Sequence, residues 1–136
     1  MNFDELQEIA HKDMKLDETN LDIESLKIPE LQHKYLKFFS NYNLLSKKVE
    51  SDYKILYRKK WEFYSGKNES PFPLKILKQD ISIYLESDEE LIELKNKLEY
   101  YKNIIVYLEG ILKSLNNRGF QIKNALDFKK FCEGLN

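Results

Sequence analysis

The sequence predicts an all-α protein built on a long helical hairpin. Only four glycines and three prolines occur in 136 residues, which favours long helices over many turns. Two stretches, residues 29–64 and 87–117, repeat apolar residues at alternating steps of four and three, as helices do when they pack along a narrow seam. Between them SGKNESPFP, residues 65–73, predicts the loop of the hairpin.

Composition indicates a soluble chain with a single domain, 1–136. Charged residues make up 33% of it, the mean hydropathy is -0.61, and no apolar run approaches the ~20 residues that span a bilayer. We therefore expect no membrane partner, and the acidic N-terminus is unlike a signal peptide. The lone cysteine, Cys132, excludes an internal disulfide and predicts a packed thiol in a reducing cytoplasm.

The N-terminal segment, 1–28, is acidic. Its first part places apolar residues at helical spacing and predicts a short amphipathic helix over residues 2–12. An irregular linker with a turn or two of helix is expected after it. Pro29 suits the first turn of a helix, where its missing N–H needs no partner. The first long helix is therefore predicted over residues 29–64.

This helix carries a seam that shifts once. The apolar positions are Leu31, Tyr35, Phe38, Tyr42, Leu45 and Val49, followed by Tyr53, Leu56 and Tyr57. At ~1.5 Å per residue the helix would be a rod of about 54 Å, too long for a chain of this size to bury alone. Gly66 suits the left-handed position just beyond its end.

The segment 65–86 is predicted as loop and extended chain. ISIYLES, residues 81–87, is short and rich in β-branched residues, so it is either a short strand near 81–86 or an extended lead-in. SDEE, which follows, predicts a capping box in which Ser87 caps the next helix and Glu90 reaches back to it.

The second long helix, 87–117, has the clearest pattern in the chain. Its seam is Leu91, Leu94, Leu98, Tyr101, Ile105, Leu108, Leu112 and Leu115. Asn116-Asn117-Arg118-Gly119 is expected to end it. Residues 118–136 then predict a separate amphipathic C-terminal helix suited to self-association, with the apolar anchors Phe120, Leu126, Phe128, Phe131 and Leu135.

The motifs that chemistry requires are missing from the sequence. His11 and His33 have no partner at metal-ligand spacing, and the scattered glycines form no phosphate-binding loop. The acidic pair Glu89-Glu90 is explained by a helix start. We therefore predict that the protein is not an enzyme and needs no metal or cofactor.

Charge is segregated although the formal net charge is only -1. Residues 1–30 hold nine acids and three lysines, and residues 86–99 hold six acids and two lysines. Residues 47–67 between them hold seven basic residues and three acids. A basic region flanked by acidic ones indicates a surface for an anionic partner.

The basic region ends in YRKKWEFYSGK, residues 57–67, with four cationic and four aromatic side chains. One interpretation is that the aromatic residues close the end of the hairpin and the cations are only solvated. The other is that cations bind the phosphates of a single strand while aromatic faces stack on its bases. Helical spacing places Lys54, Arg58 and Trp61 on one face.

The chain resembles the UvsY recombination mediators of tailed phages from end to end. The most distinctive match is RGF-x-IK, Arg118 to Lys123, and Tyr64-Ser65-Gly66 also matches. That family carries a basic motif of the form Lys-Ala-Arg-Leu before the YSG turn. The matching positions here are Arg58, Lys59, Lys60 and Trp61, so the cations are kept while their order changes.

The resemblance implies a protein that binds single-stranded DNA and loads a RecA-like recombinase onto strands coated by single-stranded-DNA-binding protein. It implies a ring-like homo-oligomer, assembled through the C-terminal anchors, that acts in the host cell cytoplasm without hydrolysing nucleotide. The DNA-binding residues would be Lys54, Arg58, Lys59, Lys60, Trp61 and Lys67. Two alternatives are a coiled-coil adaptor without a nucleic-acid role and a helical regulator that binds only another protein.

Overall fold

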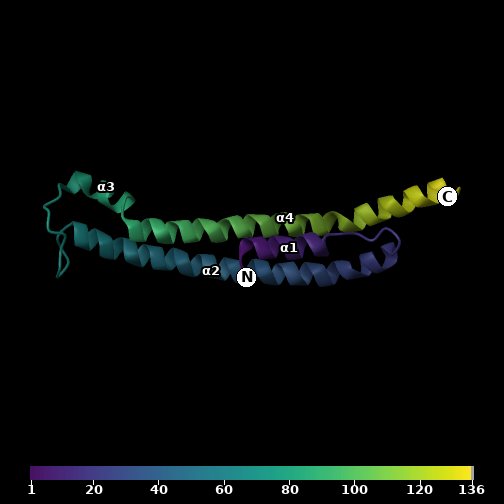
Figure 1. The fold of residues 1–136 in the computed structure, drawn as a ribbon, viewed down its shortest axis with the longest axis horizontal. Coiled ribbons are helices and arrows are strands. Elements are labelled where there is room, and N and C mark those ends of the chain that lie inside the picture. The colour runs from purple at the N-terminus through teal and green to yellow at the C-terminus, as the bar shows by residue number, and fades with distance from the viewer. Residues whose placement is uncertain (136) are drawn as a thin grey trace. The chain divides into compact units, whose positions relative to one another are not determined.

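The computed structural model describes residues 1–135, which form helices and no strand (Figure 1). Helix α1 spans Phe3–Asp13, α2 spans Leu21–Tyr64, α3 spans Ile81–Glu86 and α4 spans Glu89–Cys132. A single turn of 3₁₀ helix, Lys78–Asp80, comes directly before α3. The predicted all-α hairpin is confirmed, with α2 and α4 as its two arms.

The chain divides into two compact units, and each unit contains part of both long helices. The first holds the chain up to residue 41 and from residue 104 onward, and the second is Tyr42–Asn103. In the second unit the Tyr42 and Tyr101 rings lie 6.0 Å apart, while Lys60 Nζ lies 3.5 Å from Glu90 Oε2. The earlier residue of α2 thus contacts the later residue of α4, and the later residue of α2 contacts the earlier one of α4. The two helices are therefore antiparallel in this unit.

In the first unit, α1 packs against both long helices. The ring of Phe3 meets that of Tyr107 of α4 edge-on at 5.4 Å. At the other end of α1, Asp13 Oδ2 accepts from the Tyr35 hydroxyl at 2.7 Å and from Lys34 Nζ at 2.6 Å. Burial opposes ionisation of Asp13, yet these two bonds hold its pKa below the ordinary value. The buried apolar residues of this unit are Leu6, Ala10, Leu21, Tyr35, Ile104, Leu108, Leu115 and Ile122.

Arg118 is a buried cation in the same unit, with 2% of its surface exposed. Its guanidinium donates to the carbonyl oxygens of Met14 and Lys15, at 3.1 and 3.2 Å, and lies 3.4 Å from Glu24 Oε2. The two carbonyls follow the end of α1, where backbone acceptors lack helical partners. Arg118 therefore fastens the α1–α2 connection to α4, which gives the RGF motif a structural role.

The second unit is closed by aromatic residues. Ile81, Leu85 and Leu91 are buried at its centre, and Trp61 and Tyr64 pack against them. The Tyr64 ring lies 5.3 Å from that of Phe72 and 5.7 Å from that of Tyr84. These edge and tilted contacts tie the loop after α2 and helix α3 to the end of α2.

The predicted α4 seam is confirmed, because all eight of its residues are buried or half-buried. The seam of α2 is wrong at two positions. Tyr57, at its end, is 42% exposed. Leu45 is 41% exposed, and the inward place between Tyr42 and Val49 belongs to Ser46. Steps of four and three from Tyr42 reach Ser46 and then Val49, so the helix keeps its phase and a small polar residue occupies the seam.

The first long helix was predicted to begin at Pro29. This prediction is wrong, because Pro29 lies well inside α2. Asp17 forms a turn just before the helix, accepting from the Thr19 N–H at 3.0 Å and from Asn20 Nδ2 at 2.8 Å. Leu21 is then buried in the first turn. Tertiary burial thus offsets the ~3 kcal/mol that an internal proline costs.

The strand or extended lead-in predicted near 81–86 is wrong, because these residues form α3. Ile81 and Leu85, four apart, are both buried, and this pairing fits a helix that packs on one face. The predicted cap is also misplaced. Ser87 Oγ donates to the Ile83 carbonyl at 2.8 Å and so ends α3, whereas Asp88 Oδ1 accepts from the Leu91 N–H at 3.1 Å and caps α4.

The predicted helix end at Asn116–Gly119 is also wrong, because α4 continues to Cys132 and contains residues 118–132, which were predicted to belong to a separate helix. Arg118 and Ile122 bury on the inner face of this continuation, which outweighs the weak helix preference of the neighbouring glycine and asparagines. Cys132 is exposed rather than packed. Gly66 is the predicted left-handed residue beyond α2, with φ 81°.

Candidate nucleic-acid interface

Three of the six predicted DNA-binding residues project from α2 into solvent. Lys54, Arg58 and Lys59 are exposed. Arg58 has one acidic neighbour, with Nε 3.9 Å from Glu62 Oε1, and 70% of its side chain is accessible. An ion pair this long and this exposed contributes little. The three cations are thus available to an anionic ligand.

Lys60 lies differently, at the contact between α2 and α4. Only 19% of its side chain is exposed, and Nζ is 3.3 Å from Asp88 Oδ2 and 3.5 Å from Glu90 Oε2. Both acids belong to the start of α4, since Asp88 is its cap and Glu90 lies in its first turn. The ion pairs of Lys60 fasten the end of α2 to the beginning of α4.

Asp88 is the centre of this junction and is almost fully buried. It caps α4, pairs with Lys60 and accepts from the Tyr64 hydroxyl at 2.6 Å. Burial acts to raise the pKa of Asp88, but the three donors outweigh it and hold that pKa below its ordinary value. Burial, and then the hydrogen bond to Asp88, raise the pKa of Tyr64 to about 12. The capping role of Asp88 was not predicted from the sequence, because the cap of this helix was assigned to Ser87.

Trp61 and Lys67 lie together. Lys67 Nζ is placed 4.4 Å from the centre of the Trp61 ring, a cation–π arrangement, and Trp61 is half-buried against the apolar centre of the second unit. Lys67 itself remains exposed. Three of the four aromatic residues of YRKKWEFYSGK are thus half-buried at the end of the hairpin, while Tyr57 is exposed. Three of its four cations lie in solvent, and their binding to phosphates stays a prediction.

The predicted oligomerisation residues all lie exposed in the single chain. Phe120, Phe128 and Phe131 have exposed fractions of 70%, 67% and 76%, and Leu126 and Leu135 have 40% and 57%. Helical spacing places the three phenylalanines within one face of α4. Leu126 lies on another side, where it lines a pocket of about 410 Å³ together with Leu21, Leu26 and Ile122.

Among residues 1–135, no group of histidine, cysteine and acidic side chains could hold a metal ion. No helix in the same range is both long enough and apolar enough to cross a membrane.

The model of a protein family described as "Recombination, repair and ssDNA binding protein UvsY" matches residues 9–135. The chain belongs to the UvsY family. Its sequence is 26% identical to the recombination protein uvsY of Enterobacteria phage T4 over 136 residues, covering 98% of this chain and 99% of the phage T4 protein. The resemblance inferred from the RGF-x-IK and YSG motifs is thereby confirmed.

The fold matches crystal structures of the bacteriophage T4 recombination mediator protein UvsY. Against lattice type II the TM-score is 0.89 at 26% identity, covering 96% of this chain and 97% of the other. Against lattice type I it is 0.86 at 25% identity, covering 93% and 98%. As a UvsY family member the chain is a non-enzymatic protein of recombination and repair that binds single-stranded DNA.

Proposed function

We propose that the protein is a recombination mediator that holds single-stranded DNA on the exposed cations of α2 and helps a RecA-like recombinase assemble there. The observation that carries this proposal is the surface formed by Lys54, Arg58 and Lys59, exposed in a chain of the UvsY family. A strand coated by single-stranded-DNA-binding protein is the substrate, and the host cell cytoplasm is the place of action.

The exposed cations suit phosphates rather than bases. Lysine and arginine that neutralise phosphates release counterions, so affinity falls steeply with salt and does not depend on sequence. We assign phosphate binding to Lys54, Arg58 and Lys59, with Lys67 as a fourth cation at the loop. Lys60 already has two carboxylate partners, which supports a role in holding the hairpin end.

Self-association would supply the affinity that one chain lacks. Three neutralised phosphates give a salt slope of only about -2 on a single strand, which is a weak electrostatic term. Several copies on one strand raise the effective concentration, and avidity can gain ~10²–10⁴. The exposed Phe120, Phe128 and Phe131 support a ring-like homo-oligomer built through the end of α4, because such a cluster is unusual on a monomer.

The mediator role follows from holding the strand without using nucleotide. A strand fixed at several points on an oligomer is constrained in shape, which weakens the binding of a coat protein and favours nucleation of the recombinase. The acidic segments, 1–30 and 86–99, repel phosphate and are thus left to bind the protein partners. The alternative is a coiled-coil adaptor that acts only by binding other proteins.

Binding of labelled oligo-dT, followed by fluorescence anisotropy over a range of salt, tests the strand-binding surface. Replacing Arg58 and Lys59 by Ala should lower the salt slope by about 0.7 for each phosphate that a chain no longer neutralises. The control variant replaces Lys102 and Lys113, which are exposed on α4, by Ala. It removes the same amount of positive charge from a different helix. Equal effects of the two variants would contradict the assignment, and an adaptor would give no salt-dependent signal.

The assembly is tested by the mass of the protein in solution. Phe128→Asp with Phe131→Asp should reduce the oligomer to smaller species and weaken DNA binding by ~10²-fold or more, because avidity disappears. Val106→Asp is the control, since Val106 is 65% exposed on α4 and lies outside the cluster. An unchanged mass in the double variant would refute the proposed interface.

A further inference from the structure

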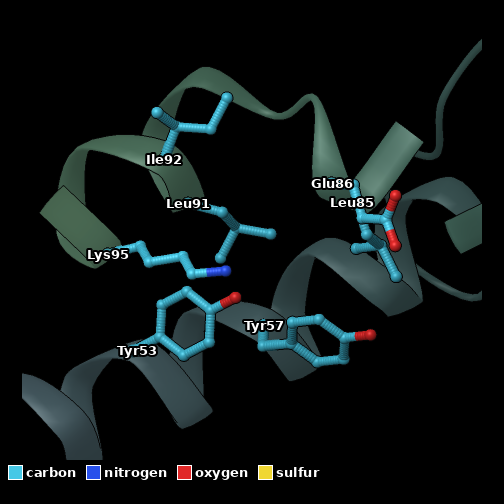
Figure 2. A pocket seen from close by; sticks show the side chains of 7 residues that line it. All are labelled: Tyr53, Tyr57, Leu85, Glu86, Leu91, Ile92 and Lys95. Carbon is cyan, nitrogen blue, oxygen red and sulfur yellow. The ribbon is translucent and has the colours of Figure 1, made fainter. Parts of the chain in front are cut away.

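A pocket of about 320 Å³ lies beside the exposed cations, wholly within the unit Tyr42–Asn103. Figure 2 shows the rings of Tyr53 and Tyr57, from α2, along one side of it. Leu91 and Lys95 of α4 lie on the other side, where the Lys95 side chain extends toward Tyr53 (Figure 2), and Ile92 of α4 also lines the pocket. Leu85 and Glu86, the end of α3, complete the lining.

The pocket has the chemistry of a site for a flat, partly polar ligand. Its volume falls within the ~300–1,000 Å³ typical of small-molecule sites, and its walls are aromatic and aliphatic with a few polar groups. Tyr57 is 42% exposed, whereas the other aromatic residues near the end of α2, namely Trp61, Phe63 and Tyr64, are half-buried. The two tyrosine rings are tilted by 40° with centres 6.1 Å apart, so they do not stack on each other and leave ring surface free.

The two tyrosines alternate with cations along α2. Lys54 follows Tyr53 and Arg58 follows Tyr57, so the sequence repeats an aromatic–cation pair four residues apart. On a helix this makes two adjacent rows, one aromatic and one cationic, with successive pairs ~6 Å apart along the axis. The aromatic row lines the pocket, and the cationic row is exposed to solvent.

We propose that this pocket is a nucleobase slot, in which a base of the bound strand stacks on Tyr57 while Lys54 and Arg58 hold the adjacent phosphates. The inference rests on the proposed function, because it adds a base-binding site to the same strand-binding surface. Charge decides the orientation of the strand. The cations stand on the α2 side, whereas Glu86 and the acidic start of α4 repel phosphate from the opposite side.

The polar groups of the slot accommodate any base. Glu86 accepts hydrogen bonds and Lys95 donates them, and every nucleobase edge carries both donors and acceptors. Stacking on an aromatic face is likewise insensitive to base identity. The slot thus holds bases without selecting a sequence, as a protein that must act anywhere on a strand requires.

This assignment differs from the set predicted from the sequence, in which Trp61 is the aromatic member of the DNA-binding residues. One face of Trp61 carries the ammonium of Lys67, and the ring packs against Ile81, Leu85 and Leu91. Tyr57 is exposed whereas Trp61 is half-buried, and Tyr57 lies nearer the exposed cations in sequence. Tyr57 is thus better placed to receive a base.

The test compares two strands with identical phosphates, an oligo-dT and an oligonucleotide of the same length in which every site is abasic. The intact protein should bind oligo-dT at least 5-fold more tightly, since one stacked base is worth about 5- to 150-fold. Tyr57→Ala should abolish this preference and leave the salt slope unchanged. Tyr57→Phe should keep the preference, because the ring remains.

Tyr100→Ala is the matched control, since Tyr100 is 41% exposed on α4 and does not line the pocket. The Tyr100→Ala variant should prefer oligo-dT over the abasic strand as strongly as the intact protein does. If Tyr57→Ala, folded by circular dichroism, retains the full preference while binding stays salt-dependent, the slot is refuted and phosphate binding stands. If the intact protein binds neither strand, the proposed function fails and the slot with it.

Discussion

Replacement of Asp88 by alanine tests the junction that holds α2 against α4. Asp88 accepts three kinds of donor: the Leu91 N–H at 3.1 Å, the Tyr64 hydroxyl at 2.6 Å and the Lys60 ammonium at 3.3 Å. Loss of a helix cap costs ~0.5–2 kcal/mol. The partly buried Tyr64 hydroxyl, left without its partner, costs up to a further ~1–3 kcal/mol. Lys60 keeps its second partner, Glu90, so the cost at Lys60 is small.

Because contributions that share one side chain are not additive, we expect Asp88→Ala to lower the free energy of unfolding by about 2–4 kcal/mol. Asp88→Asn keeps an acceptor for the cap and removes the charge, so it should cost about 1 kcal/mol. Urea unfolding followed by circular dichroism measures both, at one fixed chain concentration because association shifts apparent stability. A cost below ~0.5 kcal/mol for Asp88→Ala would refute the argument.

The same junction predicts a dependence on pH. The pKa of Asp88 is lowered in the folded protein, so ionised Asp88 contributes stability at any pH above its unfolded value of ~3.9. That contribution disappears as the pH falls through the lower folded pKa. The difference between the intact protein and Asp88→Asn should therefore be constant from pH 7 to about pH 5 and shrink below pH ~4. A difference that grows on acidification would reverse the sign and contradict the assignment.

Three further changes test other parts of the fold. Arg118→Ala leaves Glu24 with only its second cation, Lys27 at 3.3 Å, and should cost ~1.5–3 kcal/mol in urea unfolding, so a loss under ~1 kcal/mol would show that the pair is not structural. Gly66→Ala places a side chain at φ 81° and should cost about 1 kcal/mol in a thermal melt, whereas no change would mean that the turn relaxes. Tyr35→Phe removes the 2.7 Å bond to Asp13 and should cost ~1–2 kcal/mol, with faster hydrogen exchange in α1; unchanged exchange would contradict it.

Local patterns predicted the two long helices because their periodicity is strong. The eight seam positions of α4 are buried or half-buried as the spacing requires. The prediction of Leu45 was wrong because the buried place between Tyr42 and Val49 lies four residues after Tyr42, where the small polar Ser46 carries no apolar signal. Pro29 was misplaced because the rule for proline is local, while the burial of Leu21 that extends α2 is tertiary.

The candidate site was predictable in composition but not in its pairings. The sequence indicates that cations and aromatic residues gather before Gly66, and the exposure of Lys54, Arg58 and Lys59 agrees with a surface role. It does not reveal that Lys60 pairs with Asp88, because the partner lies 28 positions away on another helix. Arg118 was misjudged for the same reason: its partners come from the α1–α2 connection, so the residues after it did not end the helix.

The ammonium of Lys67 lies 4.4 Å from the centre of the Trp61 ring, so we expect the fluorescence of Trp61 to report DNA binding. The chain has a single tryptophan, so emission excited selectively at tryptophan comes from this one location without any attached dye. When a nearby phosphate attracts the ammonium away, the electric field at the indole changes, and we expect the emission to shift in wavelength or intensity. Occupancy could then be followed in real time by stopped flow on the unmodified protein, with Lys67→Ala as the variant whose signal stays silent.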